Sequence, residues 1–211
     1  MIEVLGRANS VNVQKVMWCA AELRLEVTRR DVGGVFGGTD TATYLNGNPN
    51  GKIPTLVDDG FVLWESNAIV RYLCEQYGTK ESDTALWFPA TVQQRAQANQ
   101  WMDWYQTALH APMTILFWQL IRTSEAARDQ EAIAKAIQDS ARFWEMLDRH
   151  LADSAFIVGE RPSMADIPLG CSAYRWHSMS FDRPELVNLK RWWDQLAARR
   201  AYQEQVMLPI T

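Results

Sequence analysis

The sequence lacks an excess of positive charge. Its 211 residues carry 21 lysines and arginines against 25 aspartates and glutamates, a formal net charge of -4, and the sequence pI is near 5.4. Nucleic acids and anionic membrane surfaces are usually bound through basic patches. The composition therefore predicts neither kind of partner.

Long apolar runs are also missing. No uninterrupted apolar stretch reaches the length that a membrane-spanning helix needs. The first residues, Met1 to Leu5, have neither the basic end nor the long apolar core of a signal peptide. We therefore expect a cytoplasmic protein, long enough to form two compact units.

Cysteine is scarce and scattered. Cys19, Cys74 and Cys171 form no C-x-x-C pair and stand among apolar neighbours, which predicts burial as small hydrophobic residues. The three histidines show no metal-ligand spacing with one another or with cysteine. We expect no metal site.

The most informative stretch that is present covers residues 48–73, NPNGKIPTLVDDGFVLWESNAIVRYL. Pro54 precedes the apolar run Thr55-Leu56-Val57, where it removes a backbone donor and leaves strand-edge groups free to pair with an extended ligand. The residues Asp58-Asp59-Gly60 then favour a turn into a second apolar run. This pattern predicts a hairpin beside a peptide-binding loop.

Glu65 and Ser66 follow the hairpin, directly before a helical apolar pattern. Free N–H groups and the positive end of the helix dipole favour an anion in a first helical turn. Glu65 can hold an ammonium group while Ser66 holds the adjacent carboxylate, so the pair suits the headgroup of an α-amino acid. In the alternative interpretation, Ser66 only caps its helix and Glu65 is a favourable first-turn charge.

This stretch resembles the glutathione-binding half of the cytosolic glutathione transferases, whose pattern is N-P-x-G-x-[IV]-P-x-L, a hairpin, then E-S-x-A-I-x-x-Y-L. The resemblance implies a cis Pro54, backbone pairing of Ile53 with the cysteinyl unit of glutathione, and binding of the γ-glutamyl end by Glu65 and Ser66. Lys52 would pair with the glycine carboxylate, or lie solvated beside the turn.

The family also implies the fold class, an α/β thioredoxin-like N-terminal domain followed by an all-α C-terminal domain. A strand at residues 2–5, a helix through Val13 to Leu23, a strand near 25–32 and a glycine-rich loop at 33–38 precede the hairpin and last helix. We expect domains over 1–78 and 89–211, joined by a polar linker at 79–88.

Two features of the helical half can be predicted from single residues. Pro112 is expected to kink or end the helix that carries Trp101 and Trp104. Ser163 and Asp166 form a capping-box-like helix start, similar to an S-x-A-D element of the family, and we interpret both as structural.

The resemblance implies that the group facing the glutathione sulfur, which is Tyr, Ser, Thr or Cys in different family members, lies at the end of the first strand or the start of the first helix. Residues 1–20 contain no tyrosine, and Cys19 lies well inside the helix, so Ser10 and Asn12 remain as candidates. The sequence S-V-N-V-Q-K-V resembles the serine-type theta class and bacterial nu-like relatives. Either residue can donate a hydrogen bond to the glutathione sulfur and stabilise the reactive thiolate, unless Ser10 serves only as a helix N-cap.

The second substrate should bind between the domains, against aromatic residues of the helical half. Most aromatic residues at helical spacing belong to a core, but the family builds this pocket partly from the helix that carries Trp104 and Tyr105, and we predict those two as its lining.

The resemblance thus predicts a homodimeric detoxification enzyme that transfers the thiolate of its cosubstrate glutathione to small hydrophobic electrophiles. One alternative is a glutathione-dependent disulfide or peroxide reductase of the same fold, which could use the glutathione thiol itself. The other is a non-catalytic interaction module, because fold alone does not assign function.

Overall fold

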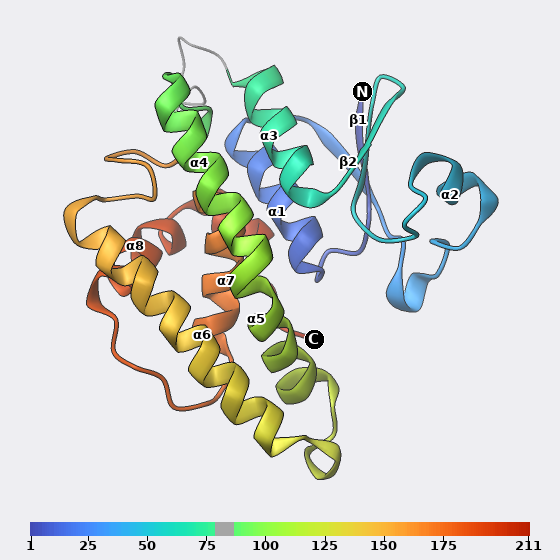
Figure 1. Cartoon of the computed structure of the whole chain (residues 1–211). Helices are drawn as coiled ribbons and strands as arrows, with labels where there is room; N and C mark the ends of the chain where they lie inside the picture. The colour runs from blue at the N-terminus through green and yellow to red at the C-terminus, as the bar shows by residue number, and fades with distance from the viewer. Residues whose placement is uncertain (79–86) are drawn as a thin grey trace.

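The structure, a computed structural model, describes residues 1–78 and 87–211. Its first part contains a four-stranded mixed sheet (Figure 1). In chain order, the strands and longer helices are β1 (Ile2–Leu5), α1 (Val11–Glu22), β2 (Val27–Arg30), β3 (Thr55–Asp58), β4 (Phe61–Trp64) and α3 (Ser66–Tyr77). The strand order is β2-β1-β3-β4, with β1 parallel to β2 and antiparallel to β3. The predicted order of elements and the thioredoxin-like arrangement are confirmed.

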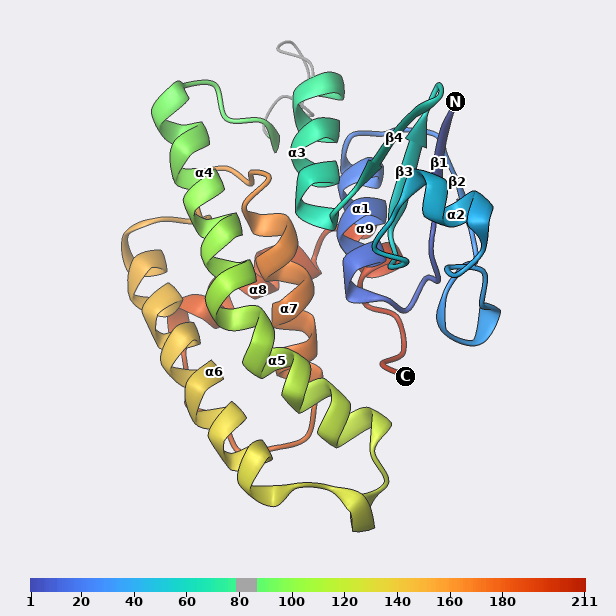
Figure 2. The ribbon, with the colours of Figure 1, turned by 45° about the vertical axis from the view of Figure 1, so that its right-hand side comes forward.

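One short helix was not predicted. α2 (Ala42–Gly47) lies in the segment that the sequence indicates only as a loop, and Thr41 caps it by accepting a hydrogen bond from the Tyr44 amide. Threonine at this position satisfies one of the free amides of a helix start, which a six-residue helix needs in order to form. α2 lies on the side of the sheet opposite to α1 and α3 (Figures 1 and 2).

The predicted hairpin joins β3 to β4. Asp59 and Gly60 both have positive φ, 44° and 90°, as a two-residue hairpin turn requires. The register pairs Thr55 with Trp64, so the residue that follows Pro54 lies opposite the one that precedes Glu65. The hairpin thereby brings the proline loop and the start of α3 to the same end of the sheet.

The second part is helical. Its α-helices are α4 (Val92–Trp104), α5 (His110–Phe117), α6 (Gln130–His150), α7 (Asp166–Ser178), α8 (Val187–Ala197) and α9 (Arg200–Gln205). Pro112 lies inside α5 and does not end it, because a π-helical turn at Tyr105–Leu109 comes just before it. The wider turn lets the chain continue past a residue whose nitrogen cannot donate.

Asp166 has the structural role predicted for it. Its buried carboxylate accepts hydrogen bonds from the Ser163 amide at 2.8 Å, the Ile157 amide at 3.1 Å and Trp192 Nε1 at 2.8 Å. Burial nevertheless raises the pKa of Asp166 to about 6. The side chain therefore joins α7, α8 and the loop before α7 within the helical core.

The two parts meet along α1. Trp18 is fully buried, and its ring centroid lies 4.8 Å from that of Tyr202 on α9 and 5.7 Å from that of Trp87. Arg199 forms an ion pair with Glu22 at 2.6 Å. Figure 2 shows α1 between the sheet and the helical half. α1 thus contributes to the cores of both parts.

Three further predictions can be compared with the described residues. All three cysteines are free and buried, as predicted, and Cys19 Sγ lies 3.5 Å from Cys74 Sγ. The linker predicted at 79–88 lies mostly outside the described residues, and the domain boundaries stay a prediction. Over 1–78 and 87–211, none of the helices combines the length and apolar character needed to cross a bilayer.

Candidate functional site

A small polar cavity of about 60 Å³ lies where the proline loop meets the starts of α1 and α3. The side chains that line it come from these three segments, namely Asn12, Asn48, Asn50, Lys52, Ile53, Pro54, Trp64, Glu65 and Ser66. Every residue predicted to bind glutathione is among them, and so is Asn12. The fold brings together groups that are 54 positions apart in the sequence, as the contact between Ser66 and Asn12 shows.

Hydrogen bonds from the neighbouring helix hold the proline loop in place. The Lys52 carbonyl accepts from Tyr44 Oη at 2.6 Å and from Asn48 Nδ2 at 2.7 Å. The Ile53–Pro54 peptide bond is cis, as the family resemblance implies. Among the described residues, no group forms a hydrogen bond with the main chain of Ile53. That main chain is therefore free to pair with an extended peptide.

The start of α3 is arranged for a charged ligand. Glu65 precedes the helix with φ of 71°, which is uncommon for a residue other than glycine, and its exposed side chain does not cap the helix. Ser66 is buried and begins the helix. A carboxylate and a set of free helix-start amides thus lie side by side, and they can hold an ammonium group and a carboxylate respectively.

Lys15 lies beneath this cavity, and its side chain is fully buried. Its Nζ donates to Asn12 Oδ1 at 3.0 Å, Ser66 Oγ at 3.4 Å and Asn67 Oδ1 at 3.5 Å, and it stands 4.6 Å from the ring centroid of Tyr105. Burial lowers the pKa of Lys15 from 10.5 to about 8. A buried ammonium with three neutral acceptors gives the cavity a positive potential.

Lys15 also determines the orientation of Asn12. An ammonium group only donates, so the Asn12 oxygen must face Lys15. Ser66 Oγ donates to the same oxygen at 3.3 Å. The Asn12 amide nitrogen consequently points away from both groups, and within the part of the chain that the structure describes it has no partner. It remains available as a donor.

Ser10 occupies the N-cap position of α1, but its side chain forms no capping hydrogen bond. The hydroxyl is therefore not committed to the helix, contrary to the interpretation of Ser10 as a plain cap. Ser10 is nearly buried and does not belong to the lining of the small cavity. Ser10 and Asn12 thus lie in one turn, but only Asn12 reaches the predicted peptide site.

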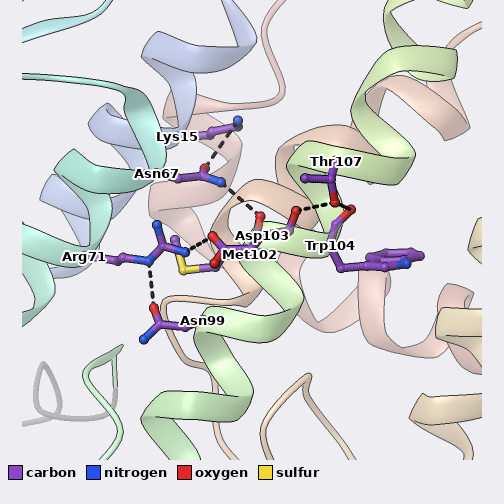
Figure 3. A network of polar contacts seen from close by, with 8 residues as sticks. All are labelled: Lys15, Asn67, Arg71, Asn99, Met102, Asp103, Trp104 and Thr107. Atoms are coloured by element: carbon purple, nitrogen blue, oxygen red, sulfur yellow. Dashed lines mark hydrogen bonds and ion pairs between the residues drawn. The ribbon is translucent and has the colours of Figure 1, made fainter.

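The polar contacts continue from Lys15 into the helical half (Figure 3). Asn67 on α3 accepts from Lys15 and donates from Nδ2 to the Met102 carbonyl of α4 at 3.1 Å. Arg71, one turn further along α3, donates to Asn99 Oδ1 at 2.7 Å and pairs with Asp103. The group beneath the cavity is therefore held by both parts of the molecule.

A second and larger cavity, of about 580 Å³, lies between the two parts. Its walls come from the turn after β1, from β2 with the following loop, and from the end of α5 with the next turn, and they consist of Arg7, Ala8, Asn9, Arg29, Asp31, Gly34, Val35, Phe36, Phe117, Trp118 and Arg122. This size is common for ligand pockets. Since Asn9 precedes Ser10, the cavity adjoins the predicted catalytic turn.

The structure places the predicted second-substrate residues elsewhere. Tyr105 is 1% exposed and its hydroxyl lies 3.1 Å from His110 Nδ1, while Trp104 packs against Trp101 and Phe143 with ring centroids 5.1 and 5.8 Å away. Neither side chain lines the larger cavity. The aromatic residues that do so from the helical half are Phe117 and Trp118, from the next turns of the same helical run.

Sequence reasoning missed Lys15 and the arginines of the larger cavity. Lysine is almost never fully buried, so its residue type gave no reason to expect Lys15 beneath the small cavity. One signal was present: Asn12 and Lys15 are three positions apart, which puts them on one face of a helix. Arg7 and Arg122 are far apart in the sequence, and only the tertiary fold brings them together.

Two family models match the chain, the N-terminal domain of glutathione S-transferases over residues 9–76 and the C-terminal domain over 130–198. The curated protein glutathione S-transferase GstB of Escherichia coli (strain K12) is 37% identical over 213 residues, covering 100% of both chains. Glutathione S-transferase D7 of Drosophila melanogaster is 33% identical over 84% of this chain and 75% of its own length.

Solved structures agree with these matches. A crystal structure of the theta class glutathione S-transferase from the citrus canker pathogen Xanthomonas axonopodis pv. citri, with glutathione bound, has a TM-score of 0.94 at 45% identity and covers 100% of this chain and 99% of that chain. The apo form of the same enzyme has a TM-score of 0.86 at 39% identity, and it covers 100% of this chain and 98% of that one.

Proposed function

The chain belongs to the cytosolic glutathione transferase family and is a glutathione transferase, and from this premise we propose how its residues bind and activate glutathione. The peptide lies in the small cavity, where the main chain of Ile53 pairs with the cysteinyl unit. Glu65 holds the α-ammonium group of the γ-glutamyl residue, and Ser66 with the first amides of α3 holds its carboxylate. Lys52, which is exposed at the rim, pairs with the glycine carboxylate.

We propose that Asn12 is the main donor to the sulfur. The observation that carries this assignment is the pair of hydrogen bonds from Lys15 and Ser66 to the Asn12 oxygen, since they direct the amide nitrogen away from Lys15 and leave it without another partner among the described residues. A hydrogen bond to a charged acceptor is worth about 1.5–3 kcal/mol, and lowering a thiol pKa by one unit needs ~1.4 kcal/mol. One such donor is therefore enough to lower the thiol pKa by about one to two units.

Lys15 acts as a positioning residue and as a source of positive potential. Its ammonium group fixes the Asn12 amide and, from below the cavity, favours the negative sulfur over the neutral thiol. Ser10 supplies a second donor to the sulfur, a hydroxyl group at the positive end of α1, because its side chain is not used as a cap.

The transfer itself needs no other group from the protein. The thiol proton leaves to water, the thiolate attacks the electrophilic carbon, a carbon–sulfur bond forms, and the leaving group departs with its electron pair. The larger cavity adjoins the catalytic turn and carries aromatic side chains, and we propose that it holds the electrophile. This assignment replaces Trp104 and Tyr105 with Phe117 and Trp118 as the aromatic contacts.

The experiment that tests this proposal is an ultraviolet difference titration of glutathione into the protein at neutral pH, which detects bound thiolate. We expect a saturable thiolate signal that is strongly reduced in Asn12→Ala. Binding of glutathione by calorimetry without any thiolate signal would contradict the activation mechanism. It would favour the reductase alternative, which must use the thiol of glutathione because all three cysteines are buried.

Two further properties stay proposals. We propose a homodimer, supported by the family and by the exposed Phe61 and Val62 on the edge strand β4; a monomeric mass in light scattering at micromolar concentration would contradict it. We also propose a role in cytoplasmic detoxification, which cell fractionation tests. The curated relatives carry the names of transferases, which argues against a non-catalytic module.

A further inference from the structure

Three guanidinium groups gather at the larger cavity. Arg7 and Arg122 line it from opposite parts of the molecule, and Arg175 on α7 stands beside them. The guanidinium carbon of Arg175 lies 4.1 Å from the ring centroid of Phe117, and that of Arg122 lies 5.5 Å from the same ring. The three groups thus surround one wall of the cavity.

Within the described residues, these arginines have only neutral partners. Arg7 donates to the Asn9 side-chain oxygen, and Arg175 donates to the Asn9 carbonyl at 3.4 Å, so both bind neutral oxygens. Over residues 1–78 and 87–211, no carboxylate forms an ion pair with Arg7, Arg122 or Arg175. Arg29, in the same lining, differs from them because Asp31 pairs with it at 2.5 Å.

The surroundings increase the effect of this charge. Burial and the nearby charge of Arg122 both lower the pKa of Arg7, and burial lowers that of Arg175 to about 10. Both arginines stay charged at neutral pH, although Arg122 disfavours the charge of Arg7, and Arg7 and Arg122 disfavour that of Arg175. A bound anion would relieve this repulsion, and guanidinium groups bind carboxylates through paired hydrogen bonds.

Part of the cavity wall is aromatic and accessible. Phe36 is 56% exposed and Trp118 is 59% exposed, and both line the cavity. Gly34 lies against the Arg7 side chain, where an added Cβ would stand 2.9 Å from Arg7 Nε. This close approach keeps Arg7 along the cavity wall, beside the aromatic surface.

We propose that the larger cavity selects electrophiles that carry a carboxylate on a flat, aromatic frame, with Arg7 and Arg122 as the residues that determine this specificity. The inference rests on the proposed function of the cavity as the second-substrate site. The carboxylate stays unchanged in the reaction. For a chloro-nitrobenzoate, the glutathione thiolate attacks the ring carbon, the carbon–sulfur bond forms, and chloride leaves with the electron pair.

The test compares two substrates of the same shape and different charge, 4-chloro-3-nitrobenzoate and 4-chloro-3-nitrobenzamide. For each, kcat/KM is divided by the uncatalysed rate constant with glutathione, which removes the difference in intrinsic reactivity. We expect the wild type to favour the acid by about tenfold, the value of one charge-assisted contact. Arg7→Gln and Arg122→Gln should each lose most of this preference.

Two further variants serve as controls. Arg149→Gln removes the same charge from an exposed position on α6 and should keep the wild-type preference. Arg122→Lys retains the charge without the planar group and should keep part of it. Circular dichroism establishes that each variant is folded.

Two results would overturn the inference. One is a preference that is equal in the wild type and in both glutamine variants. The other is an increase in the KM of glutathione that is the same with both electrophiles, which would mean that the arginines bind the peptide.

If the wild type conjugates neither compound, the proposal that transfer takes place at this cavity is wrong. The charge preference of the cavity is then tested by itself, by calorimetry with 3-nitrobenzoate and 3-nitrobenzamide. Tighter binding of the acid, lost in Arg122→Gln, supports the inference, and equal binding of the two compounds overturns it.

Discussion

The two cavities differ in how far the protein has already satisfied their polar groups. Around the small cavity, Tyr44, Asn48, Lys15 and Ser66 hold the Lys52 carbonyl and the Asn12 oxygen through specific hydrogen bonds. In the larger cavity, Arg7 and Arg122 have no carboxylate partner among the described residues, and the aromatic side chains of Phe36 and Trp118 are exposed. The first arrangement favours one ligand of fixed shape, whereas the second favours a class of ligands that share a charge and a flat surface.

The largest effect is expected for Lys15, the fully buried lysine beneath the small cavity. Its pKa falls from 10.5 in the unfolded chain to about 8 when buried, so between these values the unfolded state holds the proton and the folded state does not. Stability should therefore rise with pH through this window, by as much as roughly 3 kcal/mol from this group. Urea unfolding of the wild type and of Lys15→Met, from pH 7 to 10.5, measures the difference.

The comparison with Lys15→Met removes the contribution of groups that titrate in the same way in both proteins. The free energy of unfolding of the wild type minus that of the variant should increase with pH. Parallel curves would mean that Lys15 does not titrate in this window and does not make the free energy of unfolding depend on pH.

The next largest effect is expected for Asn12→Ala. Loss of a hydrogen bond to the thiolate, about 1.5–3 kcal/mol, should lower kcat/KM by roughly 10- to 100-fold. Ser10→Ala is the matched control in the same turn, and it should lower kcat/KM less because Ser10 does not line the small cavity. The reverse order of the two variants would assign the main donor to Ser10.

Glu65→Gln should affect the binding of glutathione at the small cavity but not the binding of the electrophile at the larger one. If Glu65 holds the α-ammonium group as proposed, removing its carboxylate should raise the KM of glutathione by about fivefold, a typical effect of one partly exposed charge contact. The KM of the electrophile should not change. Glu185→Gln, an exposed position in the helical half, removes the same charge elsewhere and should leave both KM values as in the wild type.

The smallest effect is expected for the aromatic wall of the larger cavity. Trp118→Leu should raise the KM of an aromatic electrophile by about threefold, because one exposed ring face is lost, and should leave the KM of glutathione unchanged. Trp104→Leu is the variant to compare with it, since the sequence analysis assigned Trp104 to the second-substrate pocket. If Trp104→Leu alone raised that KM, the original assignment would hold and the larger cavity would not be the substrate site.

The same contrast explains what could be predicted from the sequence. The small cavity is built mostly from one continuous stretch, so Glu65 and Ser66 could be assigned from local helix-start chemistry, and Ile53 from the family resemblance that this stretch carries. The hairpin and the order of the elements along the chain followed from local patterns, whereas the thioredoxin-like arrangement was implied by the resemblance. The walls of the larger cavity come from three distant segments, and no local pattern indicates that the turn at Arg7 meets the turn at Arg122.

Lys15 and α2 escaped prediction for other reasons. Residue type places lysine at the surface, and tertiary packing overrides this preference because Asn12, Ser66 and Asn67 supply acceptors for the buried ammonium. α2 is too short for a helical period to be visible in the sequence, and a single threonine cap is common in loops as well.

Helix α1 begins after its N-cap Ser10 and carries Asn12 and Lys15 on its first turns, and Trp18 and Glu22 of the same helix pack into the helical half. Binding at its start and packing at its end therefore share one rigid element. Glutathione should raise the melting temperature of the whole chain in a single transition, because ordering α1 also secures its contacts with α7 and α9. For the same reason, the first part expressed alone would expose the Trp18 surface and would be prone to aggregation.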